Sequence, residues 1–350
     1  MEASSSLARR GRAAGAFLFH PQLACAALTA AALALGAHSA HAGYAFQDII
    51  NNTDPTFNQE LGINNAGTIA GYYGSGAAGH PNKGYTVVPP YGQGNFTPEN
   101  FPGSVQTQVT GLNDAGTTVG FWSDTNKGVG QDSNFGFVDQ GGTFTNVNNP
   151  NTATTPPVFN QLLGVNNSNT AVGFYTGANG ATHGYTYDIA NKSFSPNIDD
   201  PNAVGNTTAA AINNHGQIAG FFTDANGAMH GFFDNGGVFT TIDVTGATST
   251  QLLGLNDNGL ADGDYVDANG VMHGLLYDLL NNTFLTLDDP FATMGTTLNG
   301  INDKNQLVGF YVNAAGNTIG LLADPVPEPA SLTLLAAGLF GLALVRRRKA

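Results

Sequence analysis

The sequence predicts an all-β fold: a six-bladed β-propeller of four-stranded antiparallel blades, closed by an N-terminal strand and followed by a C-terminal apolar helix. One unit of about 48 residues occurs six times, and each unit reads as short strands between glycine and asparagine turns. Outside the two ends, no stretch of ten residues has helical periodicity. The composition agrees, because 47 glycines and 16 prolines among 350 residues favour turns, while 41% hydrophobic residues can bury a core.

The repeated unit is defined by an asparagine turn and by glycines that follow it. A glycine stands seven residues after the turn asparagine in all six units. The asparagines are Asn64, Asn113, Asn166, Asn213, Asn256 and Asn302, and the glycines are Gly71, Gly120, Gly173, Gly220, Gly263 and Gly309. A further glycine follows in each unit, at Gly84, Gly136, Gly184, Gly231, Gly274 and Gly320. This unit length is that of a propeller blade, and propellers have four to eight blades.

The fourth unit shows how the strands are read. Residues 210–212 are apolar and precede an Asn-Asn turn, and 217–222 form the next strand pattern. The turn after it contains Asn226-Gly227, a pair that supplies the positive φ of a tight hairpin. Strand patterns at 229–233 and 238–242 complete the unit. Four strands at about ten-residue spacing predict one antiparallel meander, which must stack on its neighbours to bury both faces.

The ends of the array predict how the ring closes. The sixth unit runs from its Asn302 turn into the C-terminal tail without a fourth strand. Residues 44–50 carry the missing strand pattern, with Phe46 and Ile50 followed by Asn51. We therefore expect 44–50 to complete the sixth blade, which would remove exposed sheet edges. An open β-solenoid or tandem small sheets are the alternatives.

The first 42 residues read as a secretory signal peptide. Arg9, Arg10 and Arg12 precede the uncharged stretch 23–36, and Ala40-His41-Ala42 is a small-x-small cleavage site that predicts a mature start at Gly43. A retained N-terminal anchor and a twin-arginine signal are weaker alternatives. The single cysteine, Cys25, lies within this segment, so the exported chain has no thiol and no disulfide.

The C-terminal segment reads as a membrane-directed signal. Pro327-Glu328-Pro329 precedes the uncharged stretch 330–345, and Arg346, Arg347, Arg348 and Lys349 follow it. An apolar helix with a basic end holds that end in the cytoplasm. Sixteen residues are at the low edge for spanning a bilayer, which suits a span that is processed. A permanent C-terminal anchor is the alternative.

Two families share these patterns. The Pro-Glu-Pro motif, apolar helix and terminal arginine cluster resemble the PEP-CTERM sorting signal, which implies a Gram-negative bacterium, an exosortase that cleaves near the motif, and a link to exopolysaccharide or biofilm. Residues 60–325 resemble the exported HAF-type repeat family, which implies an extracellular location and no established activity. Units one and two depart most from the repeat, at Pro89-Pro90-Tyr91 and at Phe135-Gly136-Phe137, so we expect a function private to this chain there.

The charge of the exported part excludes some partners. Residues 43–325 contain four lysines, no arginine and 23 aspartate and glutamate residues, a formal charge of −19. Nucleic-acid binding needs Lys and Arg against phosphates, so we expect none. An acidic polysaccharide would also be repelled unless divalent cations bridged the two surfaces.

Three side-chain patterns suggest chemistry, and each has a structural explanation. His183, His230 and His273 share one repeat position, where packing is favoured over a shared zinc ion because equivalent positions on different blades lie far apart. Asp-x-Asn-Gly at 224–227 and 267–270 favours a hairpin turn over a calcium site, since few oxygen donors are present. The pairs Asp199-Asp200 and Asp288-Asp289 favour turns over a glycosidase carboxylate pair.

The sequence therefore predicts three segments: a signal peptide at 1–42, a six-repeat propeller at 43–325 and a sorting signal at 326–350. We expect an exported surface or biofilm-matrix protein that binds or supports and is not an enzyme, with no catalytic, cofactor or metal residues. Its expected partners are the exosortase, the inner membrane through the C-terminal helix before processing, and exopolysaccharide or other surface proteins. An exported carbohydrate-active hydrolase or lyase acting at the channel is the alternative, and calcium-dependent cohesion is a weaker one.

Overall fold

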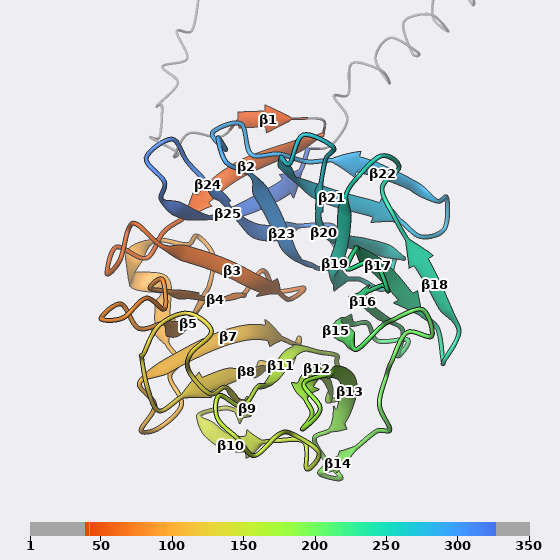
Figure 1. Ribbon diagram of the computed structural model, residues 1–350. Helices are drawn as coiled ribbons and strands as arrows, with labels where there is room; N and C mark the ends of the chain where they lie inside the picture. Colours follow the sequence, from red (N-terminus) through yellow and green to blue (C-terminus); the bar gives the residue numbers. More distant parts are fainter. Residues whose placement is uncertain (1–38, 42, 327–350) are drawn as a thin grey trace, which may run out of the picture. The chain divides into compact units, whose positions relative to one another are not determined.

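The computed structural model describes residues 39–41 and 43–326, whose regular secondary structure is almost entirely β-strand (Figure 1). The one helical element in these ranges is a 3-10 turn, η1 (Gln93–Asn95). The first strands of the units are β3 (Asn58–Ile63), β7 (Gln106–Leu112), β11 (Asn160–Val165), β15 (Asn206–Ile212), β19 (Ser249–Leu255) and β23 (Thr296–Ile301). The second strands are β4 (Ile69–Tyr73), β8 (Thr117–Ser123), β12 (Thr170–Thr176), β16 (Ile218–Thr223), β20 (Leu260–Val266) and β24 (Leu307–Val312).

The outer half of each unit completes an antiparallel meander. The third strands are β5 (Lys83–Val87), β9 (Phe135–Gln140), β13 (Thr182–Asp188), β17 (Met229–Asp234), β21 (Met272–Asp278) and β25 (Thr318–Pro325). The fourth strands are β6 (Phe96–Pro98), β10 (Thr143–Val147), β14 (Ser193–Phe194), β18 (Phe239–Ile242), β22 (Thr283–Thr286) and, in the sixth unit, β2 (Tyr44–Ile49). Within each unit the strands pair in this order, and the predicted strands of unit four are confirmed.

The sixth unit is completed by the N-terminal segment, as the sequence predicts. Strand β2 pairs antiparallel with β25, with Tyr44 opposite Pro325 and Ile49 opposite Gly320. Phe46 and Ile49 are 2% and 1% exposed, so this strand is part of the core. A short strand, β1 (Ser39–His41), pairs with the outer edge of β2. It falls within the segment read as a signal peptide, and cleavage before Gly43 stays a prediction.

The six first strands lie innermost and follow one another around an axis (Figure 1). Their backbones approach closely: a Cβ placed on Gly62 of β3 would lie 3.1 Å from the Cα of Gly111 in β7. The sixth unit meets the first in the same way, because a Cβ on Gly300 would lie 2.9 Å from the Gly62 Cα. The fold is thus all-β, antiparallel and propeller-like.

The glycine seven residues after the turn asparagine is explained by the sheet. A Cβ on Gly220 would lie 2.1 Å from the backbone oxygen of Thr208 on the facing strand, and equivalent Cβ atoms in the other five units would lie 2.0 to 2.4 Å from theirs. Each first strand also shifts register at this level, in unit four between Ala209 and Ala211. The bulge presses the backbone of the first strand against the second, and only glycine fits there.

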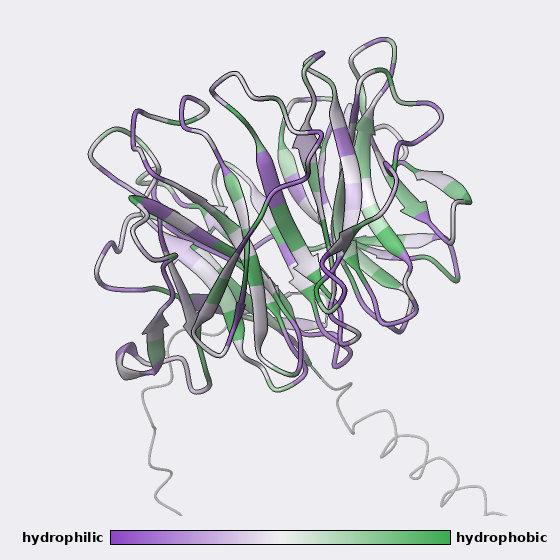
Figure 2. Cartoon of the chain, turned by 90° about the horizontal axis from the view of Figure 1, so that it is seen from below, coloured by the Kyte–Doolittle hydropathy of each residue, from purple (hydrophilic) through white to green (hydrophobic). Residues whose placement is uncertain are grey.

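The core consists of apolar clusters that join neighbouring sheets. One cluster combines Ile242 of unit four with Leu252 and Leu275 of unit five. Another combines Ile49 of β2 and Leu322 of unit six with Tyr85 of unit one. Figure 2 shows the hydrophobic bands along the strands between polar loops at both ends. Each sheet therefore buries its faces against its neighbours.

Several predictions fall outside the described residues. These are most of the signal peptide, the C-terminal apolar helix and all sorting residues, namely Pro327, Glu328, Pro329, Arg346, Arg347 and Arg348. Among residues 39–41 and 43–326, the structure has no helix long and apolar enough to cross a membrane.

Candidate functional site

At one end of the axis, the repeated asparagines form a hydrogen-bonded ring. The Oδ1 of Asn213 accepts from the backbone N–H groups of His215 and Gln217 in its own turn, at 3.1 and 3.0 Å. Its Nδ2 donates to the backbone oxygen of Asn256 in the next unit, at 3.2 Å. Every unit repeats this bond to its neighbour, and Asn302 donates to Asn64 at 2.9 Å, which completes the circle.

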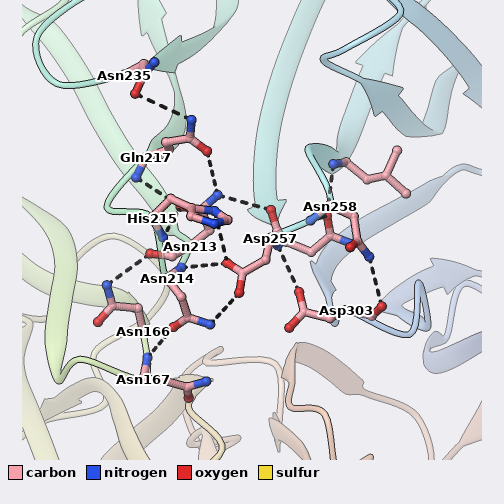
Figure 3. Close-up of polar contacts among 12 residues, drawn as sticks. Asn166, Asn167, Asn213, Asn214, His215, Gln217, Asn235, Asp257, Asn258 and Asp303 are labelled. Carbon is pink, nitrogen blue, oxygen red and sulfur yellow. Dashed lines mark hydrogen bonds and ion pairs between the residues drawn. The ribbon is translucent and has the colours of Figure 1, made fainter.

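A second ring lies at the same end, formed by the residue after each asparagine, and Figure 3 shows part of it. The backbone N–H of Asn214 donates to Asp257 Oδ1 at 2.8 Å, and the N–H of Asp257 donates to Asp303 Oδ1 at 2.9 Å. The circle closes when Asp303 N–H donates to Asn65 Oδ1 at 2.9 Å. Its six members are Asn65, Asp114, Asn167, Asn214, Asp257 and Asp303.

These two rings, which we call the Asn-ring end, hold neighbouring units together. Their amides and carboxylates are largely committed to one another and to the turns, so few groups remain to recognise a ligand. At Asp114, burial opposes ionisation, but hydrogen bonds from Asn65 and Asn167 outweigh it and lower the pKa of the carboxyl. The asparagine signature of the repeat is therefore explained by joining each unit to the next.

The opposite end of the axis opens into a cavity of about 450 Å³, which we call the mouth. Amide side chains of Gln59, Gln161 and Gln251 line it together with threonines and half-buried aromatic rings. The Nδ2 of Asn299 is buried there and has no hydrogen-bond partner in the described part of the chain. The other lining residues are Leu61, Thr110, Leu163, Phe174, Thr208, Ala210, Phe221, Leu253, Asp264, Met272, Thr297 and Phe310.

Asp264 is the one carboxylate that lines the mouth, and it breaks the repeat. It follows Gly263, at the position where the other units have Tyr72, Phe121, Phe174, Phe221 and Phe310. The side chain is 5% exposed. Burial raises the pKa of Asp264 to about 7, although a hydrogen bond with Thr297 works in the opposite direction. An alignment of the six units shows this acid, because it stands where the other units have an aromatic residue. A pattern of paired acids does not include it.

A second cavity of about 520 Å³, the side cavity, is lined by residues of units one and two and by Phe159 and Gln161 of unit three. The rings of Phe57, Phe121 and Phe159 line it and are half-buried. Its other lining residues are Tyr72, Ser75, Gly76, Asn82, Gln106, Gln108, Gly128, Val129, Gly130, Asp132, Asn134 and Gln161. The prediction of a private function in the first two units stays open, since the departures at 89–91 and 135–137 are not among the residues that line this cavity.

The three repeated histidines lie against aromatic rings, which confirms their packing role. His230 stacks on Phe222 with ring centroids 5.2 Å apart, and His183 and His273 lie equally close to Tyr175 and Tyr265. Sequence reasoning missed their carboxylate partners: His183 Nδ1 lies 2.9 Å from Asp199, His230 Nδ1 3.0 Å from Asp243, and His273 Nδ1 2.7 Å from Asp288. Among the described residues, no three His, Cys, Asp or Glu side chains are grouped to hold a metal ion.

The prediction that the repeated aspartates serve turns holds for the Asp-x-Asn-Gly hairpins and for the second member of each acidic pair, whereas Asp199 and Asp288 contact His183 and His273. Asp224 Oδ1 accepts from the N–H groups of Asn226 and Ala228, which fixes the Asp-x-Asn-Gly hairpin; the equivalent turn at 267–270 is built alike. In the acidic pairs, Asp200 and Asp289 are 3% exposed and cap the following turn through their Oδ1 atoms, at 2.8 Å.

Comparison with known proteins supports the sorting signal and the fold. Residues 325–349 match the PEP-CTERM protein-sorting motif. No match was found among curated proteins. Two solved structures share the propeller-like fold: AofleA from Arthrobotrys oligospora, with 10% identity, TM-score 0.50 and coverage of 80% of this chain and 85% of that one, and putative TolB from Agrobacterium tumefaciens, with 12% identity, TM-score 0.51 and coverage of 83% and 100%. A PL25 ulvan lyase matches more weakly, with 13% identity, TM-score 0.44 and coverage of 80% and 82%.

Proposed function

We propose that this chain is an exported six-bladed β-propeller of the HAF-repeat type that binds a ligand at its mouth and is not an enzyme. The PEP-CTERM motif indicates an exosortase substrate that is exported and sorted at the membrane of a Gram-negative bacterium. In this proposal, residues 43–325 form the closed propeller and 326–350 the sorting signal. After processing, the propeller stays at the cell surface or in the extracellular matrix.

The position of the chain ends supports a mouth that faces outward. Val326 N–H donates to the backbone oxygen of Gly43 at 2.7 Å, so both ends of the propeller leave it side by side. They do so at the Asn-ring end, because Ala323 pairs with Leu307, which comes shortly after the Asn302 turn. A propeller sorted through its C-terminus would therefore present the mouth away from the point of attachment.

The lining of the mouth is the observation on which the binding function rests. Glutamine side chains from units one, three and five, threonines and aromatic rings surround a cavity of a size that holds small organic ligands. Each glutamine offers a donor and an acceptor side by side, and half-buried rings offer flat apolar faces. Neighbouring hydroxyl groups and C–H faces of sugar rings match this combination. We therefore propose a saccharide ligand.

The test measures binding and turnover on the same exported protein, recovered as cells release it. Isothermal titration against a panel of oligosaccharides is expected to show binding that Phe221→Ala weakens, with unchanged sugar in the recovered sample. Phe284→Ala on the exposed outer strand β22 is the matched control and should bind as the parent does. Loss of sugar chains, with new reducing ends or unsaturated products, would refute a purely binding function.

Asp264 favours one second candidate, an exported hydrolase or lyase that works at the mouth. A carboxyl with a pKa of about 7 can exchange a proton near neutral pH, as a general acid or base does. This candidate predicts turnover that is lost in Asp264→Asn, while oligosaccharide affinity changes little. The binding proposal predicts no turnover in either protein.

Sorting is tested separately from binding. Removal of residues 327–350 is expected to prevent exosortase processing and to change where the protein accumulates, because the motif, apolar stretch and arginine cluster are lost together. Changing only Pro327, Glu328 and Pro329 to alanine should block processing while leaving the apolar stretch in place. Detection of the same processed, surface-associated form in both variants would overturn this part of the proposal.

A further inference from the structure

We infer that the mouth and the side cavity form one continuous groove, and that its ligand is an uncharged polysaccharide chain rather than a single sugar. This inference rests on the proposed saccharide binding at the mouth and names the class of saccharide and the path it takes. The side cavity supplies the second part of the groove. It is lined by residues of units one and two, which depart most from the repeat, and by Phe159 and Gln161 of unit three.

The two cavities meet at one shared side chain and at one hydrogen bond between their linings. Gln161 lines both of them, so its amide stands at the boundary between the two spaces. At a second point, the hydroxyl of Tyr72, which lines the side cavity, donates to Oε1 of Gln59, which lines the mouth. A chain that occupies the mouth can therefore continue past Gln161 without leaving the protein surface.

The side cavity repeats the chemistry of the mouth. Half-buried rings of Phe57, Phe121 and Phe159 line it together with the amides of Gln108 and Gln161. The Nε2 groups of these two glutamines donate to Asn82 and Asn134, at 2.9 and 2.8 Å, which holds their side chains in place. Each glutamine keeps its Oε1, a hydrogen-bond acceptor that a sugar hydroxyl can use. Ordered amides between apolar rings lose little conformational entropy when a ligand binds.

Buried polar groups fix the loops around this cavity. Asp132 is 5% exposed, and its carboxylate accepts from Thr125 Oγ1 at 2.6 Å, Lys127 N–H at 2.9 Å and Gln106 Nε2 at 3.1 Å. Burial works against ionisation of Asp132, but these hydrogen bonds prevail and lower its pKa. The carboxylate of Asp132 therefore stabilises the conformation of the loop, and its hydrogen bonds within the protein leave it little capacity to bind a ligand.

The loops of units one and two also hold each other. The side chain of Asn126 in unit two accepts from the N–H of Gly79 at 2.7 Å and donates to the oxygen of Gly76 at 3.1 Å, both in unit one. These cross-unit bonds have no counterpart in the repeat signature. They give the side cavity a defined wall in the absence of a ligand.

The charges around the groove favour an uncharged ligand. Neither cavity has a Lys or Arg among its lining residues, and the carboxylates of Asp132 and Asp264 are the charged groups present. A uronate or sulfated chain would find no cation to pair with at the lining and would meet the negative field of the protein. A chain that carries only hydroxyl groups meets no such penalty.

The size of the groove favours a chain over a single ring. The two cavities measure about 450 and 520 Å³, and each alone lies within the range of pockets that enclose drug-sized molecules. One sugar ring would contact only a part of one cavity. Affinity should therefore grow with chain length until both cavities are occupied.

The experiment uses the exported protein and two series of probes: linear uncharged gluco-, manno- and galacto-oligosaccharides from two to about eight rings, and uronate-containing oligosaccharides of equal length. We expect uncharged chains to bind, with affinity that rises at least tenfold from the shortest to the longest. Phe121→Ala in the side cavity should remove about tenfold from the long chains only. Phe221→Ala, at the same repeat position but in the mouth, should weaken short and long chains alike.

The outcomes separate this inference from the proposed function. Binding that does not increase with length, or Phe121→Ala with unchanged long-chain affinity, would overturn the continuous groove and leave binding at the mouth intact. A preference for uronate-containing chains would overturn the uncharged ligand. If neither series binds, the proposed function fails together with the inference. Phe284→Ala and the thermal midpoint of each variant show whether a loss reflects the groove or misfolding.

Discussion

Replacing one asparagine of the Asn-ring end tests the explanation of the repeat. Asn213→Ala removes four hydrogen bonds at once: two that Asn213 Oδ1 accepts within its turn, and two that its Nδ2 donates, to Gln217 Oε1 and to the backbone of Asn256. The side chain is 4% exposed, so water cannot easily replace the bond to the next unit. The change therefore weakens both the turn and the contact between units four and five.

The magnitude follows from these four bonds. A hydrogen bond contributes about 0.5 to 1.5 kcal/mol net, and a buried partner left unsatisfied costs about 1 to 3 kcal/mol. In the variant, the N–H groups of the turn can form some hydrogen bonds to water, whereas the backbone oxygen of Asn256 is less accessible to water. Together these terms predict a loss of about 3 kcal/mol in the free energy of unfolding. For a domain of this size, that corresponds to roughly 6 °C or more in the thermal midpoint.

The neighbouring residue provides the matched control. Asn214 is exposed, and its side chain makes two hydrogen bonds in the second ring. It accepts one from the Asn167 N–H at 2.7 Å and donates one to Asp257 Oδ2 at 2.8 Å. Asn214→Ala should therefore cost about 1 kcal/mol or less, since water replaces exposed partners. Differential scanning calorimetry on both variants measures the difference. Equal thermal midpoints for Asn213→Ala and Asn214→Ala would refute the reasoning that the ring of turn asparagines joins the units.

Three further predictions concern stability. Phe46→Ala should cost about 3 to 5 kcal/mol because the ring of β2 is buried in the core of unit six, whereas Phe284→Ala, at 45% exposure, should cost much less; similar urea midpoints would contradict this. Gly220→Ala should cost about 3 kcal/mol or more, since its Cβ would lie 2.1 Å from a backbone oxygen, while Gly216→Ala in an open turn with φ of 75° should cost about 1 kcal/mol, again measured by urea unfolding. Burial raises the pKa of Glu60 to about 8, although a hydrogen bond from Tyr85 opposes this. The protonated carboxyl therefore favours the folded state below about pH 4.5, and this contribution, on the order of a few kcal/mol, is lost as the pH rises toward 8. Glu60→Gln should remove this part of the pH dependence of the unfolding free energy, and an unchanged pH profile would count against it.

The fold could be predicted from the sequence where one residue type has the same structural role in every repeat unit. The missing fourth strand of unit six could be found because Phe46 stands where the fourth strands of the other units have a phenylalanine, and the pairing of β2 with β25 confirms it. The hairpins could be read because Asn226-Gly227 favours positive φ, and Gly227 has φ of 81°. These are local rules, and the repeat multiplies the evidence for each of them.

The sequence was insufficient where the partner of a residue lies in another unit. Nothing local indicates that Asn302 donates to Asn64, because the two are 238 residues apart. The same holds for the pairing of His230 with Asp243, which depends on how one loop folds back over the sheet. A polar residue in a repeat can serve its own turn or the next unit, and only the arrangement of units distinguishes these roles.

The candidate site follows from departures from the repeat, not from the repeat itself. Residues that recur in all six units, such as the turn asparagines, act on the contacts that all units share, so they indicate how the fold is joined. Residues that depart from the repeat have no such shared task, and some of them line the two cavities: Asp264 stands in place of an aromatic residue in the mouth, and Asp132 lies in the side cavity. Deviations from a repeat are therefore the better guide to the function of such a protein, since each carries a structural cost that the other units avoid.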